Sequence, residues 1–139
     1  MADPLCMVGS VLIADPEPVT QRLLREALVH DGFHVEIAAD RGGAIAYANA
    51  FDVVVADIRL DLFTILKTRA PATEVVLVTC AKTLDEAIAA VERGAFDFVL
   101  RPFFVEEVSL TVACAAARRQ RLGLVSPLSH VRKNHDRDR

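Results

Sequence analysis

The sequence has little of what stabilises secreted, zinc-binding or membrane-spanning proteins. Its 139 residues include three cysteines, one tyrosine and no tryptophan. The odd number and wide spacing of the cysteines argue against a disulfide framework and a zinc site, and Cys80 and Cys114, in apolar surroundings, are expected in the core. No apolar run approaches the length that crosses a bilayer, and the first residues lack the features of a secretory signal. We therefore expect a protein of the reducing cytoplasm.

Several motifs of enzymes are also missing. The pair Gly42-Gly43 lacks the further glycines and the lysine of a dinucleotide or phosphate-binding loop. There is no Gly-x-Ser-x-Gly stretch of the kind that holds a hydrolase nucleophile. The chain has four histidines, and their spacing is not that of metal ligands, so we expect no metal site formed by them. They are His30, His34, His130 and His135.

The composition that remains is that of one folded domain with an uneven charge. Hydrophobic residues make up 53% of the chain, enough for a core at this length. Residues 1–117 carry 9 Lys+Arg and 17 Asp+Glu, which gives a net charge of −8. Residues 118–139 carry 7 Lys+Arg and 2 Asp+Glu, which gives a net charge of +5. We divide the chain into an N-terminal extension (1–9), a domain (10–121) and a basic tail or linker (122–139). The tail is too short for a helix-turn-helix module, so nucleic-acid binding by this chain alone is not expected.

Short apolar runs alternate with amphipathic segments along the domain. Strands are predicted at 11–14, 33–38, 53–56, 75–78 and 96–100, and helices at 18–30, 41–50, 62–67, 83–93 and 106–121. Thr83 and Glu86 have the spacing of a capping box at the start of the fourth helix. Alternation of this kind predicts an α/β fold, a five-stranded doubly wound parallel sheet with helices on both faces. The runs are continuously apolar because such strands are covered on both sides.

Polar side chains follow four of these strands. Asp15, Asp57, Thr79 and Arg101 each end a strand, and the carboxyl ends of parallel strands share one edge, where ligands bind. A carboxylate can attack phosphorus to form an aspartyl phosphate. A second carboxylate can hold Mg²⁺, and a hydroxyl and a cation can bind the remaining phosphoryl oxygens. The four side chains therefore suit phosphoryl transfer.

Four stretches of the chain, "VLIADPEP", "VVVADIRL", "VVLVTCA" and "AVERGAFDFVLRPF", resemble the receiver domain of bacterial two-component response regulators. The last stretch is the most specific, and the likeness covers residues 10 to about 121. The resemblance implies a (βα)5 flavodoxin-like receiver fold. It makes Asp57 the phosphoacceptor, Thr79 and Arg101 the side chains that contact the phosphoryl group, and Phe98 the switch aromatic.

The resemblance also implies partners. A histidine kinase or a phosphotransfer protein would donate the phosphoryl group. The output would pass through the surface of the fourth helix, fifth strand and fifth helix, either to a downstream protein or to a second copy of the chain. No membrane partner and no catalytic turnover of a metabolite are expected.

The resemblance places an acidic pocket at Asp15 and Glu17. Its Mg²⁺ ligands would be Asp15, Asp57 and the backbone carbonyl of Arg59. However, the family's direct metal ligand falls on Pro16, which has no side-chain oxygen, so Mg²⁺ binding is expected to be weakened or absent.

Two further departures concern the surroundings of Asp57. Arg101 replaces the family's lysine, and a guanidinium is bulkier and pairs differently from an ammonium. The loop after Asp57 is shorter than the family's loop at this place and lacks its usual proline and glycine. Either Arg101 or Arg59 would then be able to neutralise Asp57 permanently.

Three functions stay open from the sequence. The first is a receiver that is phosphorylated on Asp57. The second is a degenerate pseudo-receiver that binds partners without phosphorylation. The third is a small aspartate-based phosphatase, although such enzymes carry a second Asp where this chain has Arg59.

Overall fold

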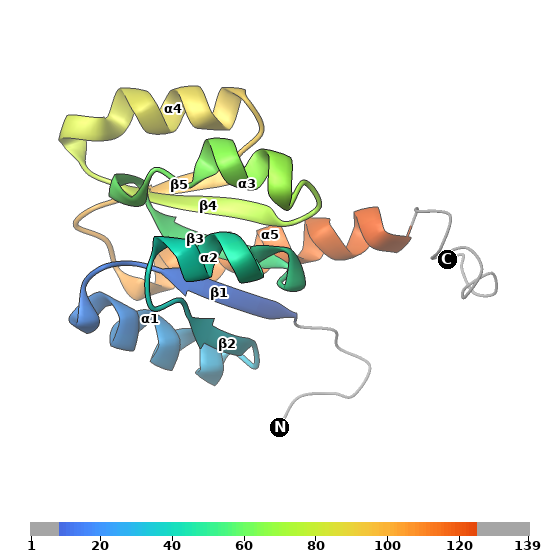
Figure 1. Cartoon of the computed structure of the whole chain (residues 1–139). Helices are drawn as coiled ribbons and strands as arrows, with labels where there is room; N and C mark the ends of the chain where they lie inside the picture. The colour runs from blue at the N-terminus through green and yellow to red at the C-terminus, as the bar shows by residue number, and fades with distance from the viewer. Residues whose placement is uncertain (1–8, 125–139) are drawn as a thin grey trace.

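The structure, a computed structural model, describes residues 9–124 as one parallel sheet with helices packed on both faces (Figure 1). The strand order is β2-β1-β3-β4-β5, and every neighbouring pair is parallel. The strands are β1 (Ser10–Ala14), β2 (His34–Ile37), β3 (Val53–Asp57), β4 (Glu74–Thr79) and β5 (Asp97–Leu100). The doubly wound sheet predicted from the sequence is confirmed.

In the part of the chain that the structure describes, five helices and three short 3-10 turns connect or follow the strands. The helices are α1 (Pro18–His30), α2 (Arg41–Tyr47), α3 (Phe63–Arg69), α4 (Leu84–Glu92) and α5 (Val105–Leu124). The turns are η1 (Ala48–Ala50), η2 (Ile58–Leu60) and η3 (Ala81–Thr83). Helices α1 and α5 cover one face of the sheet, and α2, α3 and α4 cover the other. None of the helices within 9–124 combines the length and apolar character of a membrane span.

The central strands owe their continuous apolar sequence to these two layers. In β3, Val53 and Val55 belong to the core under α1 and α5, whereas Val54 and Ala56 belong to the core under α2, α3 and α4. All four are buried, so no position of the strand can be polar until Asp57. The hydrophobic layers therefore fix where the polar edge of the sheet begins.

Two local predictions were wrong. Thr83 makes no side-chain capping bond at the start of α4; its hydroxyl instead joins Cys80 in a capping box on η3. Cys80 and Cys114 are not core residues, because Cys80 is half-buried and Cys114 is exposed. Cys114 lies on the face of α5 turned away from the sheet, opposite the buried side chains of Val108 and Val112. The predicted extension and tail lie largely outside the described residues.

Candidate functional site

Three buried polar side chains and one cation meet at the carboxyl edge of the sheet. Asp15 follows β1, Asp57 and Thr79 end β3 and β4, and Arg101 follows β5. The exposed fractions of Asp15, Asp57 and Thr79 are 4%, 2% and 1%. Beside them lies a cavity of about 210 Å³. Its lining comprises Glu17, Asp57, Ile58, Arg59, Val78, Thr79, Cys80, Thr83 and Arg101.

Asp57 is held by Arg59 through both of its carboxylate oxygens. The Arg59 backbone N–H and Nε donate to Oδ1 at 2.8 Å and 3.0 Å, and Nη2 donates to Oδ2 at 2.6 Å. This is possible because η2 begins directly after Asp57, which caps the turn and brings Arg59 back over the carboxylate. Arg59 Nη2 also lies 3.4 Å from Glu17 Oε2. A bidentate guanidinium–carboxylate pair is among the stronger polar contacts in proteins.

Arg101 bridges the two buried carboxylates. Its Nη2 donates to Asp15 Oδ2 at 2.7 Å and to Asp57 Oδ2 at 3.1 Å. Nη1 donates to the Thr20 hydroxyl at 3.4 Å, and the guanidinium lies over the Phe103 ring, 5.6 Å from its centroid. Two arginines and two aspartates are thus joined in one ion-pair network, with Glu17 beside Arg59 at its edge.

The network shifts the two carboxyl groups in opposite directions. Burial would raise the pKa of Asp57, but the hydrogen bonds and charge of Arg59, with the charge of Arg101, outweigh it and hold the pKa below its usual range. Burial raises the pKa of Asp15, against the opposing Glu17 N–H and Arg101 charge. Both carboxylates contact Arg101, but only Asp57 also has the hydrogen bonds and charge of Arg59, and the negative charges of Asp57 and Glu17 further raise the pKa of Asp15.

The short loop after Asp57 is kept in place from α2. Arg41 donates from Nε to the Leu60 carbonyl at 2.8 Å and from Nη2 to the Asp61 carbonyl at 3.0 Å. Asp61 then turns the chain with a left-handed φ of 53°, a conformation that Asp tolerates better than most residues. The buried Leu62 anchors the loop to the core just before α3. Sequence reasoning missed Arg41, because its partners lie 19 and 20 residues away and are backbone atoms.

Thr79 and Phe98 stand apart from this network. The Thr79 hydroxyl lies 2.6 Å from the Thr83 hydroxyl and 3.3 Å from the Cys80 carbonyl oxygen, so it faces η3 although it lines the cavity. Phe98 is half-buried, packs against the core under α2, α3 and α4, and is not among the cavity-lining residues. Thr83 was missed as a site residue because its sequence context indicated a cap.

The donor set does not fit a magnesium ion as it is arranged here. Asp15 accepts from the Glu17 N–H at 2.9 Å and from Arg101, and both oxygens of Asp57 accept from arginines. Pro16 offers no side-chain ligand, and two guanidinium cations already occupy the surroundings. Within residues 9–124, no cluster of three or more His, Cys, Asp or Glu side chains is suited to hold a metal.

Comparison with known proteins agrees with the fold. The model of the response regulator receiver domain family matches residues 11–113. A probable transcriptional regulatory protein of Mycobacterium tuberculosis, TcrX, is 33% identical over 117 residues, which are 78% of this chain and 50% of TcrX. The chain thus spans about half the length of that relative.

Solved structures of receivers superpose on the chain. NtrX from Brucella abortus, in complex with ADP, matches with a TM-score of 0.80 and 27% identity over 94% of this chain and 31% of NtrX. A response regulator receiver domain protein from Clostridium thermocellum matches with a TM-score of 0.71 and 27% identity, over 81% of this chain and 98% of that protein. The chain therefore belongs to the family of response regulator receiver domains.

Proposed function

We propose that this receiver is a protein-interaction module whose acidic pocket is neutralised by its own arginines instead of by Mg²⁺ and phosphorylation. The observation that carries the proposal is the bidentate pair of Arg59 and Asp57. The module would act in the cytoplasm and present a surface to a downstream protein without chemistry on a metabolite.

The pair opposes both requirements of an aspartyl phosphate. A carboxylate must attack phosphorus with an unshared oxygen lone pair, yet both Asp57 oxygens accept charged hydrogen bonds. The developing phosphoryl charge must also be neutralised, and the metal that does so in this family lacks its direct ligand at Pro16.

The obstacle set by Arg59 is modest by itself. The Arg59 side chain is 54% exposed, so after discounting for solvent its release costs about 1–2 kcal/mol. That energy lowers the fraction of molecules in which Arg59 has left Asp57 by only about 5- to 30-fold. The lack of a metal ligand at Pro16 acts independently, and the two effects together make Asp57 a poor acceptor.

The outward surface supports a binding role. On the α4-β5-α5 surface (Leu84–Glu92, Asp97–Leu100 and Val105–Leu124), together with the loop before α5, five large apolar side chains are exposed. Ile88 is 40% exposed, Leu100 41%, Phe104 76%, Leu110 68% and Leu122 52%. Apolar side chains gathered on adjoining elements are typical of partner-binding surfaces. The partner class we propose is a downstream regulatory protein or a second copy of the chain.

Phosphorylation of Asp57 by a histidine kinase or phosphotransfer protein is the second candidate. It is favoured by the exposure of Arg59 and by the cavity beside it, which Thr79 lines. Withdrawal of the guanidinium would leave room next to Asp57 for a phosphoryl group. A phosphatase activity has no such support, because Arg59 stands where those enzymes carry their second Asp.

Intact mass after incubation with acetyl phosphate and Mg²⁺ separates these functions. The proposal expects no adduct on the unmodified protein, but an adduct on Pro16→Asp/Arg59→Ala that disappears when Asp57→Asn is added. Far-ultraviolet circular dichroism confirms that each variant is folded. A phosphoryl adduct on the unmodified protein that is lost in Asp57→Asn supports the second candidate and overturns the first.

A further inference from the structure

A second group of charged side chains lies at the amino edge of the sheet, opposite the edge that carries Asp57. Glu74 begins β4, and its backbone N–H donates to the carbonyl of Asp52, the residue before β3, at 3.0 Å. Two consecutive arginines of α5 reach this edge. Arg118 Nε lies 3.2 Å from Glu74 Oε2, and Arg119 Nε lies 3.9 Å from Asp52 Oδ1. Ion pairs therefore connect the last turns of α5 to the amino ends of β3 and β4.

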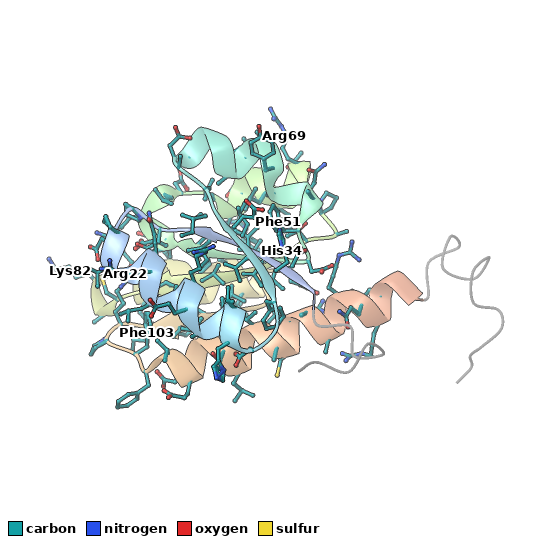
Figure 2. All side chains as sticks on the ribbon, turned by 90° about the horizontal axis from the view of Figure 1, so that it is seen from below. Arg22, His34, Phe51, Arg69, Lys82 and Phe103 are labelled. Atoms are coloured by element: carbon teal, nitrogen blue, oxygen red, sulfur yellow. The ribbon has the colours of Figure 1, made fainter. Side chains whose placement is uncertain are left out.

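These contacts begin where the apolar packing of α5 ends. The buried residues of the helix are Val108, Val112, Ala115 and Ala116. Among residues 117–122, whose exposure is described, none is buried. In both views α5 runs past the end of the sheet (Figures 1 and 2). The guanidinium of Arg118 lies over the Phe96 ring, 5.7 Å from its centroid, and so stays against the sheet. Polar contacts, rather than apolar burial, therefore hold this end of the helix.

The ionised form of Glu74 costs stability where it lies. Glu74 is 7% exposed, and burial raises the pKa of its carboxyl although the charges of Arg118 and Arg119 oppose that rise. A raised pKa in the folded protein means that the charge is less favourable there than in the unfolded chain. That cost is fully present above the folded pKa and is lost as the pH falls from it toward the ordinary value. The ion pair with Arg118 thus fixes the position of α5 without adding to the stability of the domain.

The contact of Arg119 is also an imperfect one. Its Nε is buried and donates to no acceptor in the part of the chain that the structure describes, because 3.9 Å to Asp52 is too long for a hydrogen bond. Asp52 Oδ2 instead accepts from the Ser10 N–H at 2.9 Å and from the Ser10 hydroxyl at 3.2 Å. A buried donor without an acceptor destabilises the arrangement that buries it. Both arginine contacts therefore hold the end of α5 only weakly.

We propose that Glu74 and Arg118 form a proton-sensitive latch that holds the last turns of α5, residues 117–124, against the amino edge of the sheet. While Glu74 is ionised, its ion pair with Arg118 keeps these turns in place. Protonation of Glu74 removes the pair, and the turns then separate from the sheet. The charged groups that face Glu74 are Arg118 and Arg119, both from α5, and Asp52 faces Arg119. The latch thus sets the direction in which α5 leaves the domain, and it lies outside the Asp57 network.

Amide hydrogen exchange combined with urea unfolding tests the latch at neutral pH. Glu74→Gln removes the charge and keeps the size of the side chain, so exchange in residues 117–124 should speed about two- to fivefold while residues 106–112 stay unchanged. The free energy of unfolding should be equal to or higher than that of the unmodified protein, because the costly charge is gone. Arg118→Gln should speed the same amides, and the double variant should add nothing further. Glu106→Gln, at an exposed position of α5, is the matched control.

The pH dependence of exchange separates a latch from a contact that is only structural. The ratio of exchange rates in residues 117–124 and 106–112, each corrected for intrinsic exchange, should rise as the pH falls through the folded pKa of Glu74. Carbon-13 NMR of the Glu74 carboxyl group measures that pKa. In Glu74→Gln the ratio should not depend on pH, whereas Asp57→Asn should behave like the unmodified protein. Unchanged exchange in Glu74→Gln, a lower unfolding free energy of that variant, or the same pH dependence in it would overturn the proposal.

Discussion

Arg59 binds the carboxylate of Asp57 from two positions further along the chain, with Nη2 2.6 Å from Oδ2 and Nε 3.0 Å from Oδ1. The contact is local in sequence, because η2 folds directly after β3. It places a permanent positive charge where a receiver of the ordinary kind would use a dissociable metal. The charge around Asp57 thus depends on side chains of this chain, and substitution of these side chains should change it measurably.

Substitution of Arg59 is expected to raise the pKa of Asp57. Arg59→Ala removes the hydrogen bonds and the charge that outweigh the effect of burial, and leaves only Arg101 as a cationic partner. Carbon-13 NMR of the Asp carboxyl groups measures the pKa directly. Arg22→Ala, at an exposed position of α1, is the matched control. An Asp57 pKa that is the same in all three proteins would show that the pair does not form in solution.

Asp57→Asn is expected to destabilise the fold at neutral pH by about 1–3 kcal/mol. The Asn amide would direct donor N–H groups at the arginines that now donate to the carboxylate. Because the folded pKa of Asp57 is lowered, its contribution is present above the unfolded value of about 3.9 and is lost as the pH falls through the folded value. Urea unfolding at neutral and acidic pH measures the free energy of unfolding of Asp57→Asn and of the unmodified protein. The difference between the two should become smaller at low pH.

The exposed Asp61→Asn provides the control for that experiment, since Asn also tolerates a left-handed backbone. Its unfolding free energy should stay close to that of the unmodified protein. If Asp57→Asn were instead stabilising at neutral pH, the pocket would contain carboxylates that repel one another and are not neutralised.

Removal of Arg101 is expected to cost more than removal of Arg59. The Arg101 side chain is 26% exposed and pairs with Asp15 and Asp57, whose side chains are each 2% exposed. Arg101→Ala would leave both carboxylates without their shared cation. We expect a loss of about 2–3 kcal/mol in the free energy of unfolding, below the full cost for a completely buried pair. Arg101→Lys keeps a cation and should recover more than half of the loss. Equal stability of the Ala and Lys variants would show that charge at this position is unimportant.

Arg41 is expected to act as a positioning residue for the loop after β3. Arg41→Ala frees the carbonyl groups of Leu60 and Asp61, and should speed amide hydrogen exchange in residues 58–62 while leaving β1 and β4 unchanged. Arg22→Ala again serves as the comparison at an exposed arginine. Unchanged hydrogen exchange in residues 58–62 would mean that the loop keeps its conformation without the hydrogen bonds from Arg41.

Much of the architecture could be predicted because the pattern in the sequence reflects burial directly. Val53 to Ala56 are apolar without interruption because each is covered from one side or the other, and Asp57 marks the end of that cover. The alternation of strands and helices implies a parallel sheet, and the shared edge of such a sheet is sufficient to predict that Asp15, Asp57 and Arg101 meet.

The partners of individual polar groups could not be predicted in this way. Arg101 reaches Thr20 across 81 positions of the chain, and Arg41 binds carbonyl groups whose orientation depends on the turn. The roles of Thr79 and Phe98 stay predictions.

Titration of the isotopically labelled protein with Mg²⁺, followed by proton–nitrogen NMR, tests the central claim most directly. If Arg59 and Arg101 already neutralise Asp15 and Asp57, the amide signals of these residues should show no saturable shift. The same titration of Pro16→Asp/Arg59→Ala should produce one, because that variant gains a ligand and loses a cation. A saturable shift at Asp57 in the unmodified protein would contradict an arginine-neutralised pocket.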